Sequence, residues 1–275
     1  MLVSIIIPVY NRASFVPKAV ESVLMQTFKS FELIIVDDNS DDETYFSILP
    51  YLKDRRISYH YLKKNRGVSF SRNFGIKIAK GKLIAFLDSD DYWLPEKLEK
   101  QIEYMKEKNF KICQTDEIWI RRGKFVNPKK KHQKIEGDIF DKSLELCIVS
   151  PSAVLIKKEI FDEVGLFDEN LPACEDYDLW LRISLKYKVG LLNEKLIVKR
   201  NGQDDQLSAI KGLDKFRIYS LLKLLKNENL DEKRKKKVIN VLTKKCQIYL
   251  NGLLKRGKIK EAEKYRRILN EFKKC

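Results

Sequence analysis

An apolar run ends abruptly in acidic residues at Lys82-Leu83-Ile84-Ala85-Phe86-Leu87-Asp88-Ser89-Asp90-Asp91. The run reads as a buried strand, so the carboxylates lie at its carboxyl end, where open α/β sheets bind their ligands. Carboxylates this close repel one another unless a cation lies among them, and oxygen ligands suit Mg²⁺ or Mn²⁺ carried on a substrate phosphate. The alternative interpretation is an acidic turn that caps a helix beginning near Pro95, with Asp91 close to its start.

The chain before this stretch repeats a unit of strand and helix. Near-continuous apolar runs predict buried strands at residues 2–10, 31–36 and 57–62. Helical spacing predicts helices between them, one capped by Ser14 and reaching up to residues 26–28, then 43–52 and 69–79, the last followed by Gly81 as its C′ residue. This order predicts an α/β fold with a Rossmann-like, mostly parallel sheet flanked by helices, whose ligand-binding loops after three of the strands meet at one edge.

The chain after Pro95 is expected to extend this domain. The pattern predicts a helix to about residue 108, strands at 110–115, 117–120 and 152–156, and a short helix that ends at Gly165. Residues 125–138 are polar and lysine-rich, and we expect them to form a loop that borders the acceptor. A packed helix at 175–186 places Glu175 and Asp176 at its N-terminus.

The composition indicates a globular protein with reduced thiols. The chain has 275 residues, of which 44% are hydrophobic, which is enough for a sizeable core. No apolar run approaches the ~20 residues of a spanning helix, and no basic region or cleavage site of a signal peptide precedes the first strand. The five cysteines are odd in number and include no Cys-x-x-Cys pair, which disfavours a disulfide framework or a zinc site. We therefore expect a cytoplasmic protein.

The positive charge is concentrated in the C-terminal tail. Residues 200–275 contain 22 basic and 9 acidic residues, a net charge of +13 out of +16 for the whole chain. Amphipathic patterns predict a helical appendage with helices at 213–225, 233–254 and 258–272, and a turn at Gly257. Such a tail could contact an anionic membrane peripherally, at its inner face, or could be only a well-solvated surface. Nucleic acid is disfavoured as a partner because aromatic interleaving and known binding motifs are missing from the tail.

Five motifs follow one another along the chain. They are Ile7-Pro8-Val9-Tyr10-Asn11, Val36-Asp37-Asp38-Asn39-Ser40, Asn65-Arg66-Gly67 with Ser71-Arg72-Asn73-Phe74-Gly75, Phe86-Leu87-Asp88-Ser89-Asp90-Asp91, and Glu175-Asp176-Tyr177-Asp178-Leu179-Trp180. In this order they resemble the family 2 glycosyltransferases over residues 1 to about 208. The resemblance implies a GT-A domain at 1–208, with a nucleotide-sugar half at about 1–110 and an acceptor half at about 111–208, followed by a basic helical extension at 209–275.

The resemblance implies a donor site for a nucleoside-diphosphate sugar, usually a UDP-sugar, at the strand ends. Pro8, Tyr10 and Asp38 match positions that hold the base. Arg66 and Arg72 suit nucleotide or phosphate oxygens because a guanidinium is a planar donor of several hydrogen bonds. Their alternative role is an ion pair at the surface.

The acidic turn matches the DXD motif of such enzymes. The resemblance assigns Asp88 to the ribose or the donor sugar, with Ser89 beside it, and assigns Asp90 to the metal, Mg²⁺ or Mn²⁺. The cation is needed because charge develops on the leaving diphosphate. Asp91 could instead be structural.

The acceptor hydroxyl is a poor nucleophile, so a carboxylate must take its proton. Asp176 matches the family's base, and a single displacement of this kind inverts the anomeric configuration. Glu175, Trp180 and Gln203 are candidates for contacting the acceptor or for supporting the residues that do. Many relatives carry a histidine near Gln203 that can complete the metal site, so here an amide, a water molecule or Asp204 is left as the third ligand.

These motifs imply transfer of a sugar from a nucleotide donor to a saccharide or lipid-linked acceptor, in the synthesis of cell-surface polysaccharide or glycoconjugates. The alternative is a non-enzymatic α/β protein whose basic tail binds nucleic acid or an anionic membrane. A nucleotidyltransferase also uses acidic strand ends, but the glycine-rich N-terminal phosphate loop expected of it is missing.

Overall fold

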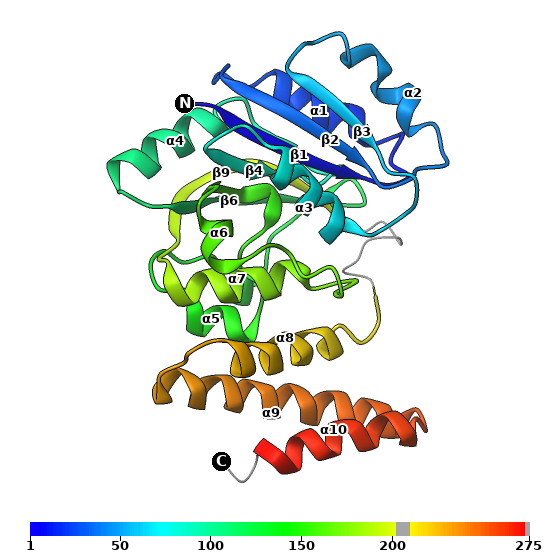
Figure 1. The fold of residues 1–275 in the computed structure, drawn as a ribbon, viewed down its shortest axis with the longest axis vertical. Coiled ribbons are helices and arrows are strands. Elements are labelled where there is room, and N and C mark those ends of the chain that lie inside the picture. Colours follow the sequence, from blue (N-terminus) through cyan, green and yellow to red (C-terminus); the bar gives the residue numbers. More distant parts are fainter. Residues whose placement is uncertain (202–209, 273–275) are drawn as a thin grey trace.

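The computed structural model describes residues 1–201 and 210–272 and shows an α/β body followed by a stack of helices (Figure 1). Four parallel strands form its first half, in the order β3-β2-β1-β4. They are β1 (Val3–Val9), β2 (Phe31–Asp37), β3 (Ile57–Tyr61) and β4 (Leu83–Phe86). All seven residues of β1 are buried, which is why its sequence is an uninterrupted apolar run rather than an alternating one. The predicted parallel sheet is therefore confirmed for this half.

Helices cross between these strands as predicted, with two local differences. They are α1 (Val16–Leu24), α2 (Thr44–Ile48), which continues as a 3₁₀ turn at Leu49–Tyr51, and α3 (Val68–Ile78). Phe15 rather than Ser14 is the N-cap of α1, and no side chain caps it. Gly81 is not a left-handed C′ residue; a Cβ there would lie 2.6 Å from the Ser4 backbone nitrogen, so close packing requires the glycine.

The second half of the sheet is mixed. Strand β8 (Val154–Lys157) runs antiparallel to β4 and to β6 (Ile112–Arg121), which in turn pairs in parallel with β9 (Gly190–Asn201). The two strands predicted at 110–120 are thus one strand, irregular around Asp116. Part of the predicted loop at 125–138 is also structured, as the edge strand β7 (Lys124–Val126) and a 3₁₀ turn at Lys130–His132.

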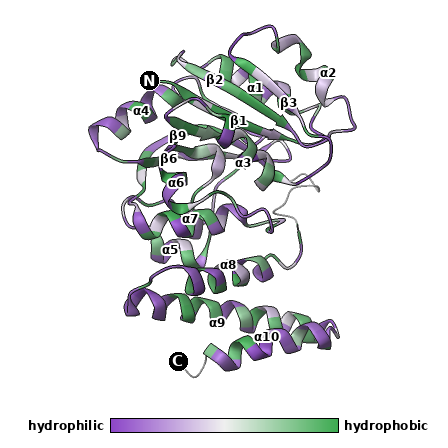
Figure 2. Ribbon diagram, in the orientation of Figure 1, coloured by the Kyte–Doolittle hydropathy of each residue, from purple (hydrophilic) through white to green (hydrophobic). Residues whose placement is uncertain are grey.

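Helices cover both faces of the sheet, and hydrophobic residues colour its strands in Figure 2. One core lies between the sheet and α1 with α4 (Lys97–Glu107), and a second lies beneath α3, α6 (Ile160–Val164) and α7 (Glu175–Lys186). Helix α7 has the predicted bounds, and Gly165 ends α6 with a φ of 78°. A two-residue strand, β5 (Tyr92–Trp93), separates the acidic turn from α4.

The C-terminal helices pack against the body. They are α8 (Asp214–Asn227), α9 (Glu232–Lys255) and α10 (Ile259–Phe272), and with α5 (Phe140–Glu145) and α7 they enclose a third core. Tyr177 and Leu181 of α7 belong to that core, so the appendage shares a helix with the α/β body. Across residues 1–201 and 210–272, the helices are all too short or too polar to cross a membrane.

Candidate active site

The carboxyl ends of β1, β2 and β4 meet at one edge of the sheet, as the strand order requires (Figure 1). At the end of β2, the two Asp38 oxygens accept hydrogen bonds from the backbone N–H groups of Arg66 and Gly67, each at 2.7 Å. Gly67 has a φ of 86°, which this turn into α3 requires of a glycine. Burial raises the pKa of Asp38. Asp38 therefore holds the donor-side loop in place, and its remaining lone pairs are available to a ligand.

The two residues expected beside the base differ in exposure. Pro8 is buried within β1, whereas Tyr10 follows the strand and exposes its ring. Asn11, with a φ of 51°, ties this loop to the one after β2 through Ser40 and Asp41. Only Tyr10 of the expected pair can present its side chain to a nucleotide.

Arg66 precedes α3 and Arg72 lies within it, and the two have different surroundings. The Arg66 guanidinium stacks 3.5 Å from the Phe70 ring and lies 3.8 Å from Glu169, so the surface ion pair is present. The Arg72 side chain is only 4% exposed; its Nη1 donates to Glu175 Oε1 at 2.6 Å and its Nη2 to Asp88 Oδ1 at 2.7 Å. Arg72 therefore joins the acidic turn to the start of α7 instead of pointing at open solvent.

Arg72 is the centre of a buried charge cluster. Burial alone would lower its pKa, but the carboxylates of Asp88 and Glu175 outweigh burial and raise it. Burial and the nearby Asp176 raise the pKa of Glu175 to about 6, although Arg72 opposes them. The next residue on α3, Asn73, holds the segment before α7 by exchanging hydrogen bonds with the Phe167 backbone.

The acidic turn divides its carboxylates between solvent and protein. Asp88 is 27% exposed at its side chain and Asp90 is half-buried, while Ser89 is buried. Asp91 is buried and accepts from the Ser152 hydroxyl at 2.7 Å and the Arg200 backbone N–H at 3.0 Å. Asp91 thus ties the turn to the end of β9. It does not cap α4, because β5 lies between them.

A lysine that the sequence analysis did not single out lies among these acids. Lys199 of β9 donates to the Ser150 hydroxyl at 3.1 Å. Burial lowers its pKa, but the carboxylates of Glu117, Asp91 and Asp88 outweigh burial and raise it. Its only sequence signal is a cation directly after the short apolar run Leu196-Ile197-Val198. Lys199 therefore supplies a fixed positive charge behind the acidic turn.

Asp176 lies half-buried in the first turn of α7. Its Oδ1 accepts the Tyr177 backbone N–H at 2.7 Å, and its Oδ2 lies 3.4 Å from the Cys147 sulfur. Burial and Asp176 raise the pKa of Cys147 well above its ordinary value, so this cysteine is a neutral thiol that can donate to the carboxylate. Cys174, with a left-handed φ of 61°, turns the chain into α7.

Two further candidates from the sequence are Trp180 and Gln203. Trp180 is buried in the second core against Phe167, so support from behind fits its position and contact with an acceptor does not. Gln203 and Asp204 lie outside the described residues. Within residues 1–201 and 210–272, no group of three or more His, Cys, Asp or Glu side chains is placed to hold a metal ion. Asp88 and Asp90 are two carboxylates on one turn, which suits a Mg²⁺ or Mn²⁺ ion that takes its other ligands from water and phosphate.

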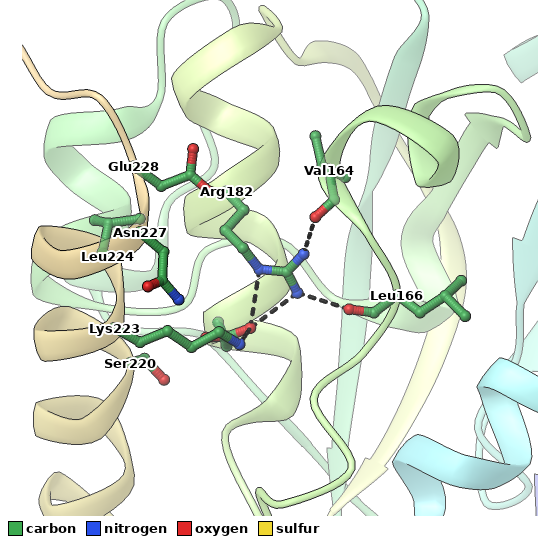
Figure 3. Close-up of a pocket in the computed structure, with 9 residues that line it drawn as sticks. Val164, Leu166, Arg182, Ser220, Lys223, Leu224, Asn227 and Glu228 are labelled. Carbon is green, nitrogen blue, oxygen red and sulfur yellow. Dashed lines mark hydrogen bonds and ion pairs between the residues drawn. The ribbon is translucent and has the colours of Figure 1, made fainter.

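Helix α7 is also held from the side of α8, across a cavity of about 240 Å³ (Figure 3). Lys223 of α8 lies 2.7 Å from Asp168 and 3.0 Å from Asp178. Arg182 donates to Asp178 and to the carbonyl oxygens of Val164 and Leu166. These contacts join the C-terminal helices to the helix that carries Asp176.

Sequence comparison places this architecture among known proteins. The family model of glycosyl transferase family 2 matches residues 4–165. An uncharacterized glycosyltransferase of Rickettsia felis is 40% identical over 196 residues, which cover 70% of this chain and 32% of that protein. The chain therefore spans about a third of the length of that relative. WfaP of Escherichia coli, named as a UDP-Glc:α-D-GlcNAc-diphosphoundecaprenol β-1,3-glucosyltransferase, is 36% identical over 193 residues, covering 67% of this chain and 71% of WfaP.

Solved structures share the fold at low sequence identity. TarS of S. aureus (residues 1–349), solved with UDP-GlcNAc, has a TM-score of 0.73 at 18% identity and covers all of this chain and 92% of TarS. The mannosyltransferase PcManGT of Pyrobaculum calidifontis, solved with GDP-Man and Mn²⁺, has a TM-score of 0.63 at 14% identity and covers 98% of this chain and 83% of that one. The predicted GT-A fold is confirmed. Together with the family match, this shows that the chain belongs to glycosyl transferase family 2.

Proposed function

We propose that this protein transfers a sugar from a UDP-sugar to a lipid-linked saccharide, with inversion, in the synthesis of a cell-surface glycoconjugate. One observation carries the proposal most directly. Arg72 bridges Asp88 on the acidic turn and Glu175 on α7, so the expected donor site and the expected base, Asp176, are built as one unit. A non-enzymatic scaffold would not require this link between the two halves.

Relatives support the substrate classes. The name of WfaP gives UDP-Glc as donor and a diphosphoundecaprenol-linked GlcNAc as acceptor, and a TarS structure contains UDP-GlcNAc. In this chain, the exposed Tyr10 ring and the Asp38 carboxylate lie at the ends of β1 and β2, where a uracil base would stack and donate its ring N–H. The placement of Tyr10 and Asp38 therefore supports a uracil base, and the relatives support a UDP-sugar donor and a lipid-linked acceptor.

In the proposed mechanism, Asp90 would hold Mg²⁺ or Mn²⁺, which would supply charge neutralisation on the leaving diphosphate, and Asp88 would contact the ribose or the donor sugar. Arg72 keeps Asp88 in position through its second nitrogen. Asp176 takes the proton of the acceptor hydroxyl as that oxygen attacks the anomeric carbon, and the diphosphate leaves from the opposite face. Its place in the first turn of a 12-residue helix puts the carboxylate at the positive end of the helix dipole.

Cys147 and Lys199 support this arrangement. The Cys147 thiol, close to Asp176 Oδ2, orients the carboxylate while leaving its charge intact. Lys199, behind the acidic turn, limits the repulsion between carboxylates before a donor binds. We place the reaction on the cytoplasmic side of a membrane, where a lipid-linked acceptor and a nucleotide sugar meet. We also propose that the glycosyltransferase domain ends near residue 208.

Donor binding and turnover test the proposal separately. Thermal shifts with UDP-Glc, UDP-GlcNAc and GDP-mannose, each with and without Mn²⁺, should show Mn²⁺-dependent stabilisation by a UDP-sugar. Asp90→Ala should abolish that shift. Asp176→Asn should keep it and lower nucleoside diphosphate release by roughly 10²- to 10⁴-fold with a lipid-linked acceptor.

The matched control is Asp162→Asn, an exposed carboxylate in the first turn of α6, which should change neither readout. Absence of nucleotide binding by the unmodified protein would contradict the proposed function. Equal loss of binding and turnover in both site variants would contradict the separate roles of Asp90 and Asp176.

A further inference from the structure

The turn between α9 and α10 combines cationic and aliphatic side chains, all of them exposed. This α9–α10 tip consists of Leu254, Lys255, Arg256, Gly257, Lys258, Ile259 and Lys260. It has four cations and no acid in seven residues. Leu254 is 38% exposed and Ile259 is 55% exposed.

The tip's charges are not used by the fold. Among the described residues, none of its four cations forms an ion pair. The cations nearer the start of α9 differ: Arg234, Lys235 and Lys237 each lie within 4 Å of a carboxylate. The four cations of the tip are therefore uncompensated within the described part of the chain, and they lie close together, between residues 255 and 260.

The tip's aliphatic side chains are not used by the fold either. Leu250 and Leu253 of α9 and Leu269 of α10 fill the core between the helices, whereas Leu254 and Ile259 point out of it. The hairpin behind the tip is firmly joined, since Tyr249 donates to Glu261 at 2.9 Å and packs on Tyr265 with ring centroids 4.7 Å apart. The exposed aliphatic groups are thus carried on a rigid support.

The tip lies on the same side of the molecule as the candidate active site. In Figure 1, the turn from α9 to α10 is at the right, as are the carboxyl ends of β1 and β2 and the start of α3. Figure 2 shows hydrophilic residues over much of α9 and α10, so the flanks of the hairpin suit solvent. A flat surface that touched the tip on this side would face the edge of the sheet where the donor site lies.

We propose that the α9–α10 tip docks on an anionic lipid bilayer, with its cations at the headgroup phosphates and Leu254 and Ile259 in the interface. Basic residues near an anionic leaflet and aliphatic residues at its boundary are the two attractions that hold a peripheral protein. Docking holds the active-site edge next to the bilayer. The benefit of holding the active-site edge near the bilayer rests on the proposed function, because only a lipid-linked acceptor would be located there.

Vesicle co-sedimentation of the full chain tests docking without donor or acceptor. The protein should bind phosphatidylglycerol–phosphatidylcholine vesicles, not pure phosphatidylcholine vesicles, and binding should weaken as salt rises. Lys258→Glu/Lys260→Glu should lower the partition coefficient at least roughly 25-fold, at about fivefold for each lysine that is lost. The matched control, Lys233→Glu/Lys236→Glu, removes the same charge at the other end of α9 and should retain most binding.

Insertion of the aliphatic residues has its own readout. Leu254→Ser/Ile259→Ser should lower partitioning by roughly tenfold, while Met25→Ser, an exposed apolar control at the end of α1, should not. In Ile259→Trp, indole fluorescence should be quenched by brominated acyl chains, and in Met25→Trp it should not. Circular dichroism and thermal melting establish that each variant is folded.

Three outcomes would overturn the docking proposal: equal loss in tip and control variants, no quenching of the tip tryptophan, or equal affinity for duplex DNA and anionic vesicles. Vesicle binding without any UDP-sugar binding would instead refute the proposed function and leave docking in place. UDP-sugar turnover on a water-soluble acceptor without vesicle binding would refute docking alone.

Discussion

Replacing Arg72 with methionine tests how the acidic turn after β4 and the start of α7 are joined. The substitution keeps an unbranched apolar stem but removes the guanidinium, whose two terminal nitrogens lie 2.6 Å from Glu175 and 2.7 Å from Asp88. Asp88 is 27% exposed and can be solvated instead. Glu175 is 5% exposed and cannot, so the variant leaves one buried carboxylate without its countercharge.

Removing one partner of a buried ion pair costs about 3–5 kcal/mol. We expect Arg72→Met to lower the free energy of unfolding by roughly 3 kcal/mol at about pH 7.5, the low end, because Asp88 gains water. Arg72→Lys should recover only part of this loss, since one ammonium cannot reach both carboxylates as the planar fork does.

The loss should depend on pH in a direction set by Glu175. Its pKa is raised from 4.5 to about 6, so between these values the native state binds more protons than the unfolded chain. Stability from this group is therefore fully present below pH 4.5 and is lost as pH rises through 6. Without Arg72 the pKa of Glu175 rises further, so the variant loses more of its free energy of unfolding as the pH rises. The difference in the free energy of unfolding between variant and wild type should therefore be smaller by about 2 kcal/mol at roughly pH 5 than at about pH 7.5.

Urea unfolding at both pH values measures these differences. Arg56→Met is the matched control, because Arg56 forms a 2.7 Å pair with Asp54 at the surface, where such pairs contribute at most about 1 kcal/mol. Arg72→Met/Glu175→Gln should regain more than half of the loss, since the uncompensated charge is gone. A loss no larger than that of the control, or one independent of pH, would refute the reasoning.

Three further substitutions follow from the structure. Cys147→Ala should lower kcat between twofold and tenfold at unchanged donor affinity, while Cys147→Ser, which keeps a donor for Asp176, should restore it; steady-state kinetics with each substrate varied decide this. Lys223→Met removes the ammonium between α8 and α7 and should lower kcat more than donor affinity in the same assay, and Lys226→Met, on the exposed face of α8, should not. Burial lowers the pKa of Lys97 to about 7 from 10.5, so the unfolded chain binds more protons in that range and stability rises with pH across it. Lys97→Met should raise the free energy of unfolding by roughly 1–4 kcal/mol near pH 7 and flatten that rise, as urea unfolding across the range would show.

The first half of the fold could be predicted because its pairing is local in sequence. Strands buried on both faces have continuous apolar runs, and short right-handed crossovers leave few ways to order them. The second half could not be ordered this way, because β6 pairs with strands about 40 and 80 residues further along. Asp116 also interrupts the apolar pattern of β6, which is why one irregular strand was predicted as two.

The sequence was enough to predict which strand ends form the candidate site. It was not enough to predict which side chains contact one another there. Parallel strands alone imply that Asp38 and Asp88 lie at the same edge of the sheet. That Arg72 would contact Glu175, 103 residues away, depends on how α7 packs over α3. A guanidinium suits phosphate and carboxylate equally well, so its chemistry could not choose between them. The contact of Cys147 with Asp176 could not be predicted, because a single thiol outside any motif carries no signal in the sequence.

The position of Asp176 depends on both ends of the chain. From the donor half, Arg72 holds the neighbouring Glu175; from the C-terminal helices, Lys223 holds Asp178 two residues later. Tyr177, between them, is buried in the core that α8 and α9 complete. A helix fixed on two sides can keep a carboxylate aligned with a donor bound elsewhere. The C-terminal helices thus support the helix that carries Asp176, and any surface they dock on is mechanically connected to the candidate active site.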